Sequence, residues 1–169
     1  MSEDVNTLLA IAEIAGVFVG FAALLTVVGR RAESNDRSGE GLLLATVVLV
    51  SVVVIVAAMV PVVLNRYGLA QLSVWRVSSG VYFVVNWAQI LYVGRRTLGY
   101  RAAHSQQPVL SLAVWSLEPL LQISLILCIF GAWASLAPAF YLTALAVALI
   151  QVSLMLALLV VNLITAEPA

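Results

Sequence analysis

The chain has 169 residues, of which 63% are hydrophobic and 9% charged, and its mean hydropathy is +1.11. A soluble domain carries about 25% charged residues, so this composition excludes a globular domain with a water-facing surface, and its apolar content excludes a disordered chain. Eight acidic residues balance eight basic ones, all of them arginine. We therefore expect a single transmembrane domain, residues 1–169, in the cell (cytoplasmic) membrane.

Five runs of the sequence are apolar enough to cross a membrane as helices, which needs about 20 residues for a hydrocarbon layer about 30 Å thick. In chain order they are 6–29, 42–64, 72–94, 109–136 and 139–164. The fourth contains Pro119, so its helix begins either at 109, with a kink, or at Ser116, with the proline in its first turn. Because hydrocarbon leaves no water for unpaired backbone groups, the runs predict an all-α integral membrane protein, a five-helix bundle.

The arginines predict the orientation of this bundle. Segments 30–41 and 95–108 together hold Arg30, Arg31, Arg37, Arg95, Arg96 and Arg101. The segment 65–71 holds Arg66 alone, and 137–138 holds none. Because arginine-rich loops stay on the cytoplasmic side, we expect the N-terminus outside and the C-terminus in the cytoplasm.

A charged side chain inside the hydrocarbon costs at least about 2.5–3.5 kcal/mol, so each one needs a reason. Glu13 shares a helical stripe with Gly16 and Gly20, and Ala12, Gly16 and Gly20 form a series of small residues that favours close helix packing. We expect this face to contact protein. The carboxylate is either paired with an arginine, protonated in place, or handling a proton or cation. Arg76, near the outer end of its span, either reaches the interface or pairs with Glu13.

Further polar residues lie within the third, fourth and fifth runs. Glu118 either complements the dipole at the start of its helix or shares a polar face with Gln122. The amides of Asn86 and Gln151 either bond helices together, as such groups do in many bundles, or line a hydrophilic path. The resulting pathway candidates are Glu13, Arg76, Asn86, Glu118, Gln122 and Gln151, and the helix-packing candidates are Ala12, Gly16, Gly20, Ala144 and Ala148. Three aromatic residues, Trp75, Trp133 and Tyr141, are expected near the outer interface.

The sequence holds little that points to catalysis. It has one cysteine, Cys128, one histidine, His104, and no lysine. These counts argue against an internal disulfide, a metal site and a lysine-bound cofactor, and we expect neither enzyme activity nor a metal or cofactor. The expected function is a small oligomeric ion channel or permeation pathway. The alternative is an accessory or scaffold subunit of a membrane complex. Expected partners are the lipid bilayer, further copies of the chain or another membrane protein, with ions as cargo and no nucleic acid.

Overall fold

In the computed structural model, the described residues are 2–29, 38–101, 108–131 and 133–165, and they form five α-helices and one 3-10 helix. The elements are α1 (Ser2–Gly29), α2 (Ser38–Arg66), α3 (Gln71–Arg101), α4 (Pro108–Phe130), η1 (Ala134–Leu136) and α5 (Ala137–Thr165). Side chains are described for 3–27, 41–95, 115–131 and 133–161. The predicted all-helical chain with five helices is confirmed. The fourth helix begins early and contains Pro119, and it ends at Phe130 rather than at 136.

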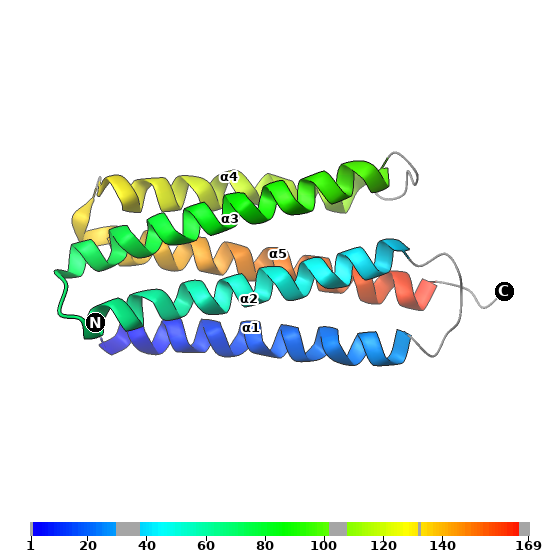
Figure 1. Cartoon of the computed structure of the whole chain (residues 1–169), viewed down its shortest axis with the longest axis horizontal. Helices are drawn as coiled ribbons and strands as arrows, with labels where there is room; N and C mark the ends of the chain where they lie inside the picture. Colours follow the sequence, from blue (N-terminus) through cyan, green and yellow to red (C-terminus); the bar gives the residue numbers. More distant parts are fainter. Residues whose placement is uncertain (1, 30–37, 102–107, 132, 166–169) are drawn as a thin grey trace.

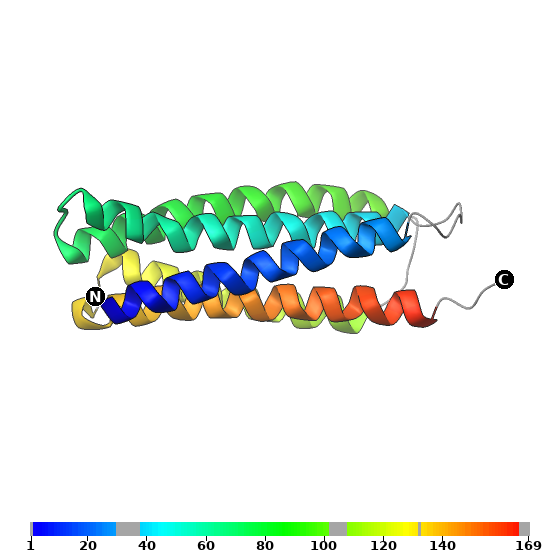
Figure 2. The ribbon, with the colours of Figure 1, turned by 90° about the horizontal axis from the view of Figure 1, so that it is seen from below.

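The helices run alternately up and down a long bundle (Figure 1). The ends of α1, α3 and α5 and the beginnings of α2 and α4 lie at one end of it, as both ribbon views show (Figures 1 and 2). The helix ends that flank segments 30–37 and 102–107 therefore all lie at the same end of the bundle. Arg30, Arg31, Arg37 and His104 lie outside the described residues, as do the side chains of Arg96 and Arg101, whereas Arg95 is exposed.

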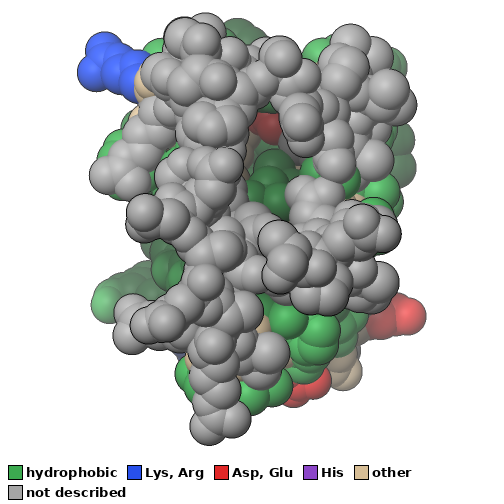
Figure 3. Space-filling view, turned by 90° about the vertical axis from the view of Figure 1, so that its right-hand side faces the viewer, with side chains coloured by type: hydrophobic (Ala, Val, Ile, Leu, Met, Phe, Trp, Pro, Cys, Tyr) green, Lys and Arg blue, Asp and Glu red, His purple; other side chains and the backbone are tan. Residues whose placement is uncertain are grey.

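Three helical stretches among the described residues are long and apolar enough to cross a membrane, namely Glu3–Val27, Gly41–Arg66 and Ala134–Val161. A shorter apolar stretch, Trp115–Phe130, lies in α4. Seen from the end of the bundle, hydrophobic side chains dominate the rim of the described surface (Figure 3). Length and composition thus support a membrane protein.

Helix α5 holds the bundle together, because it contacts α1, α2, α3 and α4. Its buried face presents Ala144 and Ala148, which are 0% and 1% exposed. Small side chains let helix backbones approach closely, and tight packing drives helix association where the hydrophobic effect is weak. Both alanines therefore occupy packing positions in the core.

Two of the aromatic residues expected near the outer interface are buried within the bundle. Trp75 on α3 is 3% exposed and Tyr141 on α5 is 0% exposed, and their ring centroids lie 5.7 Å apart. Tyr82 packs edge-on against Tyr141 with the centroids 6.3 Å apart. The rings of Trp75 and Tyr141 fill the space between α3 and α5, whereas Trp133 is exposed. Their closeness to a membrane interface stays a prediction.

The hydroxyl of Tyr141 also provides a hydrogen bond that the backbone of α2 lacks. Pro61 lies inside α2 and has no N–H, so the carbonyl of Ala57, four residues earlier, loses its helical donor. The Tyr141 hydroxyl donates to this carbonyl oxygen at 2.6 Å. Because Ala57 is buried and a buried carbonyl needs a hydrogen-bond partner, α5 supplies the donor that the proline removes and ties α2 to α5.

Candidate functional site

The Glu118 carboxylate of α4 is held by three side-chain amides. Asn86 Nδ2 donates to Glu118 Oε1 at 2.6 Å, and Gln122 Nε2 donates to the same oxygen at 2.8 Å. Gln151 Nε2 donates to Glu118 Oε2 at 3.0 Å. The donors come from α3, α4 and α5, so these side chains, the Glu118 cluster, bring three helices to one carboxylate.

Local geometry explains the cluster's assembly. Gln122 lies one turn beyond Glu118 and therefore on the same face of α4. Asn86 and Gln151 lie near the middle of α3 and α5, and each is 5% exposed. Each of the three donors is a neutral amide, so their hydrogen bonds satisfy the carboxylate oxygens without supplying a positive charge. These three partners therefore leave the charge of the carboxylate without a positively charged neighbour from their own side chains.

The inner face of α3 extends this polar region along the bundle. At 100° per residue, Ser78, Ser79, Tyr82, Asn86 and Gln89 fall within about 100° of the helix circumference. Six buried polar atoms of the described residues have no hydrogen-bond partner: Ser51 Oγ, Trp75 Nε1, Ser78 Oγ, Ser79 Oγ, Gln89 Oε1 and Gln122 Oε1. A buried polar atom left unpaired costs about 1–3 kcal/mol. One of these atoms, Gln122 Oε1, belongs to the Glu118 cluster itself.

The Arg76 side chain of α3 caps the end of α4 by hydrogen-bonding its last carbonyl groups. Its Nε donates to the Ile129 carbonyl and its Nη2 to the Phe130 carbonyl, both at 2.9 Å. The next residue, Gly131, has φ +63°, and a Cβ there would lie 3.2 Å from the guanidinium. The cation thus complements the negative end of the helix dipole. The hypothesised pair of Glu13 with Arg76 is not formed, because the guanidinium binds α4.

Glu13 lies apart from the cluster, on the exposed side of α1. Gly16 and Gly20 are exposed on the same side, and a Cβ at either would meet no atom within 4 Å. Ala12 is partly buried against the core. The face expected to pack on protein is therefore uncovered within a single chain.

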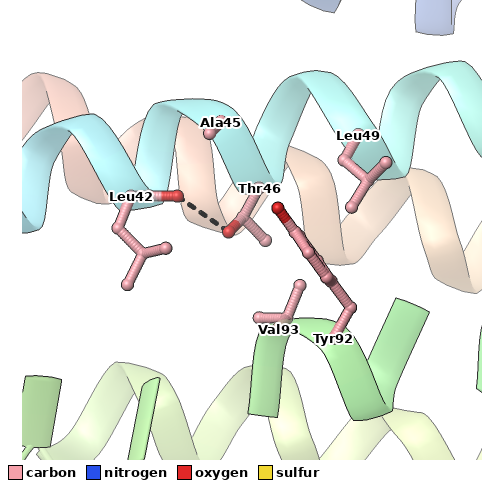
Figure 4. Close-up of a pocket in the computed structure, with 6 residues that line it drawn as sticks. All are labelled: Leu42, Ala45, Thr46, Leu49, Tyr92 and Val93. Carbon is pink, nitrogen blue, oxygen red and sulfur yellow. Dashed lines mark hydrogen bonds between the residues drawn. The ribbon is translucent and has the colours of Figure 1, made fainter. Parts of the chain in front are cut away.

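A cavity of about 150 Å³ lies between α2 and α3, lined by Leu42, Ala45, Thr46, Leu49, Tyr92 and Val93 (Figure 4). The Thr46 hydroxyl donates to the Leu42 carbonyl at 2.8 Å, so its hydrogen is used within α2. No charged side chain lines this cavity, and none of the predicted pathway residues does. The cavity is therefore separate from the Glu118 cluster.

The structure brings together four of the six predicted pathway residues, Asn86, Glu118, Gln122 and Gln151. It leaves Glu13 and Arg76 elsewhere. Sequence reasoning missed Tyr141 as the donor to Ala57, although Pro61 signals that an internal carbonyl of α2 needs a donor. Within the described residues, no three histidine, cysteine, aspartate or glutamate side chains gather as a metal site requires. No protein-family model, curated protein or solved structure matches the chain.

Proposed function

We propose that the chain is a multi-pass protein of the cell membrane that forms an oligomeric ion channel or permeation pathway, with Glu118 as the group that binds the passing cation or proton. One observation carries this proposal: a carboxylate inside the bundle is bonded to neutral amides of three helices. Ionisable groups inside membrane spans are rare and mark ion paths and proton relays. An acidic group in a pore favours cations.

The proposal places all five helices across the membrane, N-terminus outside and C-terminus in the cytoplasm. Helices α1, α2 and α5 support it by their apolar length, and α4 by its shorter apolar stretch. Helix α3 is more polar, but its residues Ser78, Ser79 and Asn86 are buried in the bundle, whereas Val77, Val81 and Val84 are exposed. A helix with its polar face turned inward suits a membrane crossing beside a hydrophilic path.

Within this pathway Glu118 attracts the cation and the amides position the carboxylate. The unpaired oxygens Gln122 Oε1 and Gln89 Oε1 are acceptors, and oxygen acceptors replace the water shell that a cation loses on entering a pore. The buried serine hydroxyls of α3, Ser78 and Ser79, add polar atoms along the same face. A cation or proton travelling along α3 thus meets polar groups before and after Glu118.

Ion flux in liposomes tests this function. We expect the purified protein to conduct protons or monovalent cations, measured with a pH-sensitive dye and with K⁺ and Na⁺ gradients. Glu118→Gln keeps the side-chain size but removes the charge, so flux should fall at least about 10-fold, a change of about 1.4 kcal/mol in the barrier. Glu3→Gln, which removes an exposed acidic charge at the start of α1, is the matched control and should retain flux.

Two results contradict the proposal: wild-type flux no greater than that of empty liposomes, or Glu118→Gln flux equal to wild type. Monodisperse elution of each variant from a sizing column controls for folding.

The uncovered α1 face favours a second candidate, an accessory or scaffold subunit that binds another membrane protein. Small residues such as Gly16 and Gly20 suit contact with a foreign helix as well as with a second copy. Under this alternative the chain co-purifies with a second polypeptide and conducts nothing by itself. Under the channel proposal it forms a homo-oligomer of defined size in detergent.

A further inference from the structure

We infer that the cavity between α2 and α3 binds an acyl chain of an anionic phospholipid, whose phosphate contacts Arg95. This inference rests on the proposed membrane location, and it does not depend on conduction through Glu118. It assigns a ligand to the cavity that lies apart from the Glu118 cluster.

The walls of the cavity suit hydrocarbon and offer little to a polar ligand. Four of the six lining residues are aliphatic, and the ring of Tyr92 rises from α3 toward α2 (Figure 4). The sixth residue is Thr46, whose hydroxyl already donates its hydrogen to the Leu42 carbonyl at 2.8 Å. A ligand in this cavity therefore gains mainly apolar contacts.

The size of the cavity favours part of a chain over a larger ligand. Its volume is about 150 Å³, whereas pockets for drug-sized molecules measure roughly 300–1,000 Å³. An apolar cavity of about 150 Å³ is nevertheless large enough to bind benzene. The lining on α2 runs from Leu42 to Leu49, which is about 10 Å along the helix. A space of this length and volume suits several methylene groups in a row.

The position of the cavity gives a lipid access to it. Leu42 lies in the second turn of α2, at the start of the apolar stretch Gly41–Arg66. Ala45 and Tyr92 are exposed, so residues on the outer surface of the bundle border the cavity. In the proposed membrane arrangement, the first carbons of the lipid tails lie at this depth.

Arg95 supplies the positive charge that distinguishes a phospholipid from other apolar ligands. It is exposed and lies three residues after Tyr92, so the two side chains are neighbours on the surface of α3. It is also the first residue beyond the predicted span 72–94, and long basic side chains at span ends reach the interface. Arginine forms strong charged hydrogen bonds with phosphate.

The charge around the cavity favours a lipid with a net negative charge. Helix α3 contains no acidic residue, and none of the six lining residues is charged. A zwitterionic headgroup would bring a second positive charge close to Arg95, whereas an anionic headgroup would not. Basic residues at the membrane surface attract anionic lipids for this reason.

Native mass spectrometry of the purified, delipidated protein tests the site. The probes are phosphatidylglycerol, which is anionic, and phosphatidylcholine with the same acyl chains. We expect one phosphatidylglycerol per chain to bind about fivefold more tightly than phosphatidylcholine, the effect typical of one basic residue beside an anionic lipid. Diacylglycerol, which has the chains but no phosphate, should bind no more tightly than phosphatidylcholine.

Arg95→Gln removes the charge and tests the headgroup contact. The affinities for the two phospholipids should then lie within about twofold of each other. Arg66→Gln is the matched control, because Arg66 is also exposed but lies at the opposite end of the bundle. This control should keep the preference for phosphatidylglycerol.

Ala45→Trp places a large ring at the cavity and tests the acyl-chain contact. It should lower the affinity for both phospholipids at least about threefold, because the methylene groups lose their packing contacts. Ala23→Trp changes an exposed alanine near the same end of the bundle and should leave both affinities unchanged. Monodisperse elution of each variant controls for folding.

Photo-cross-linking locates the chain directly. Phosphatidylglycerol with a diazirine in its acyl chain should label peptides that contain residues 42–49 or 92–93, and Ala45→Trp should remove this label. Labelling of the wild type only elsewhere overturns the inference, as do equal affinities for the two phospholipids or unchanged binding by Ala45→Trp.

These experiments read no flux. Failure of the channel proposal therefore leaves the lipid site standing, and failure of the lipid site leaves the Glu118 pathway standing. Release of the chain from cell membranes by alkaline extraction contradicts the membrane location, and with it both proposals.

Discussion

Replacing Glu118 by leucine should destabilise the bundle by about 3 kcal/mol or more. Leucine leaves the amide hydrogens of Asn86 and Gln151 without the acceptor that they use at 2.6 and 3.0 Å. Each buried donor left unpaired costs about 1–3 kcal/mol, and both residues are 5% exposed. Gln122 lies on the same helix and is only partly buried, so it has more freedom to find another partner.

Unfolding of purified protein in mixed micelles measures this effect. Glu118→Gln retains an acceptor oxygen and should lose about half as much, because hydrogen bonds to charged groups contribute about 1.5–3 kcal/mol and neutral ones about 1 kcal/mol. Glu3→Leu removes an exposed carboxylate and controls for net charge. A Glu118→Leu protein as stable as wild type contradicts the hydrogen-bonded cluster.

A double-mutant cycle on Pro61 and Tyr141 should show strong coupling. Tyr141→Phe removes the 2.6 Å bond to the Ala57 carbonyl, and this should cost about 1–3 kcal/mol because the carbonyl is left without a donor. Pro61→Ala restores the N–H that bonds this carbonyl within α2. In the Pro61→Ala background, Tyr141→Phe should therefore cost at least about 1 kcal/mol less.

The same unfolding assay measures all members of the cycle, and Tyr67→Phe provides a control at an exposed tyrosine. Additive effects of Pro61→Ala and Tyr141→Phe show that the hydroxyl does not replace the missing donor. Interaction energies between contacting residues are commonly 0.5–3 kcal/mol, so the expected coupling lies within reach of the measurement.

The sequence predicted much of the fold because hydrophobic run length decides where helices form. It left open where the fourth helix begins and placed its end at 136. The structure begins this helix at Pro108 and ends it at Phe130, where Gly131 takes a left-handed conformation and Arg76 of α3 caps the carbonyls. That end depends on a side chain more than 50 residues away in sequence, so local pattern does not reveal it.

The site was predictable as a set of residues but not as an arrangement. Periodicity places Glu118 and Gln122 on one face of α4, and it gives Asn86 and Gln151 their own faces. Which of these faces meet depends on the rotation and neighbours of α3, α4 and α5, which helical period does not specify. For the same reason Glu13 and Arg76 look like partners in sequence, whereas the bundle directs one outward and the other to α4.

Cysteine labelling in intact cells tests the central claim, that the chain crosses the membrane five times with both arginine-rich segments in the cytoplasm. A membrane-impermeant maleimide should label Ser135→Cys, an exposed position of η1, in intact cells. It should label Ser34→Cys and Ser105→Cys only after the membrane is opened. Labelling of Ser34→Cys and Ser105→Cys from opposite sides contradicts the arrangement of crossings on which the Glu118 pathway depends.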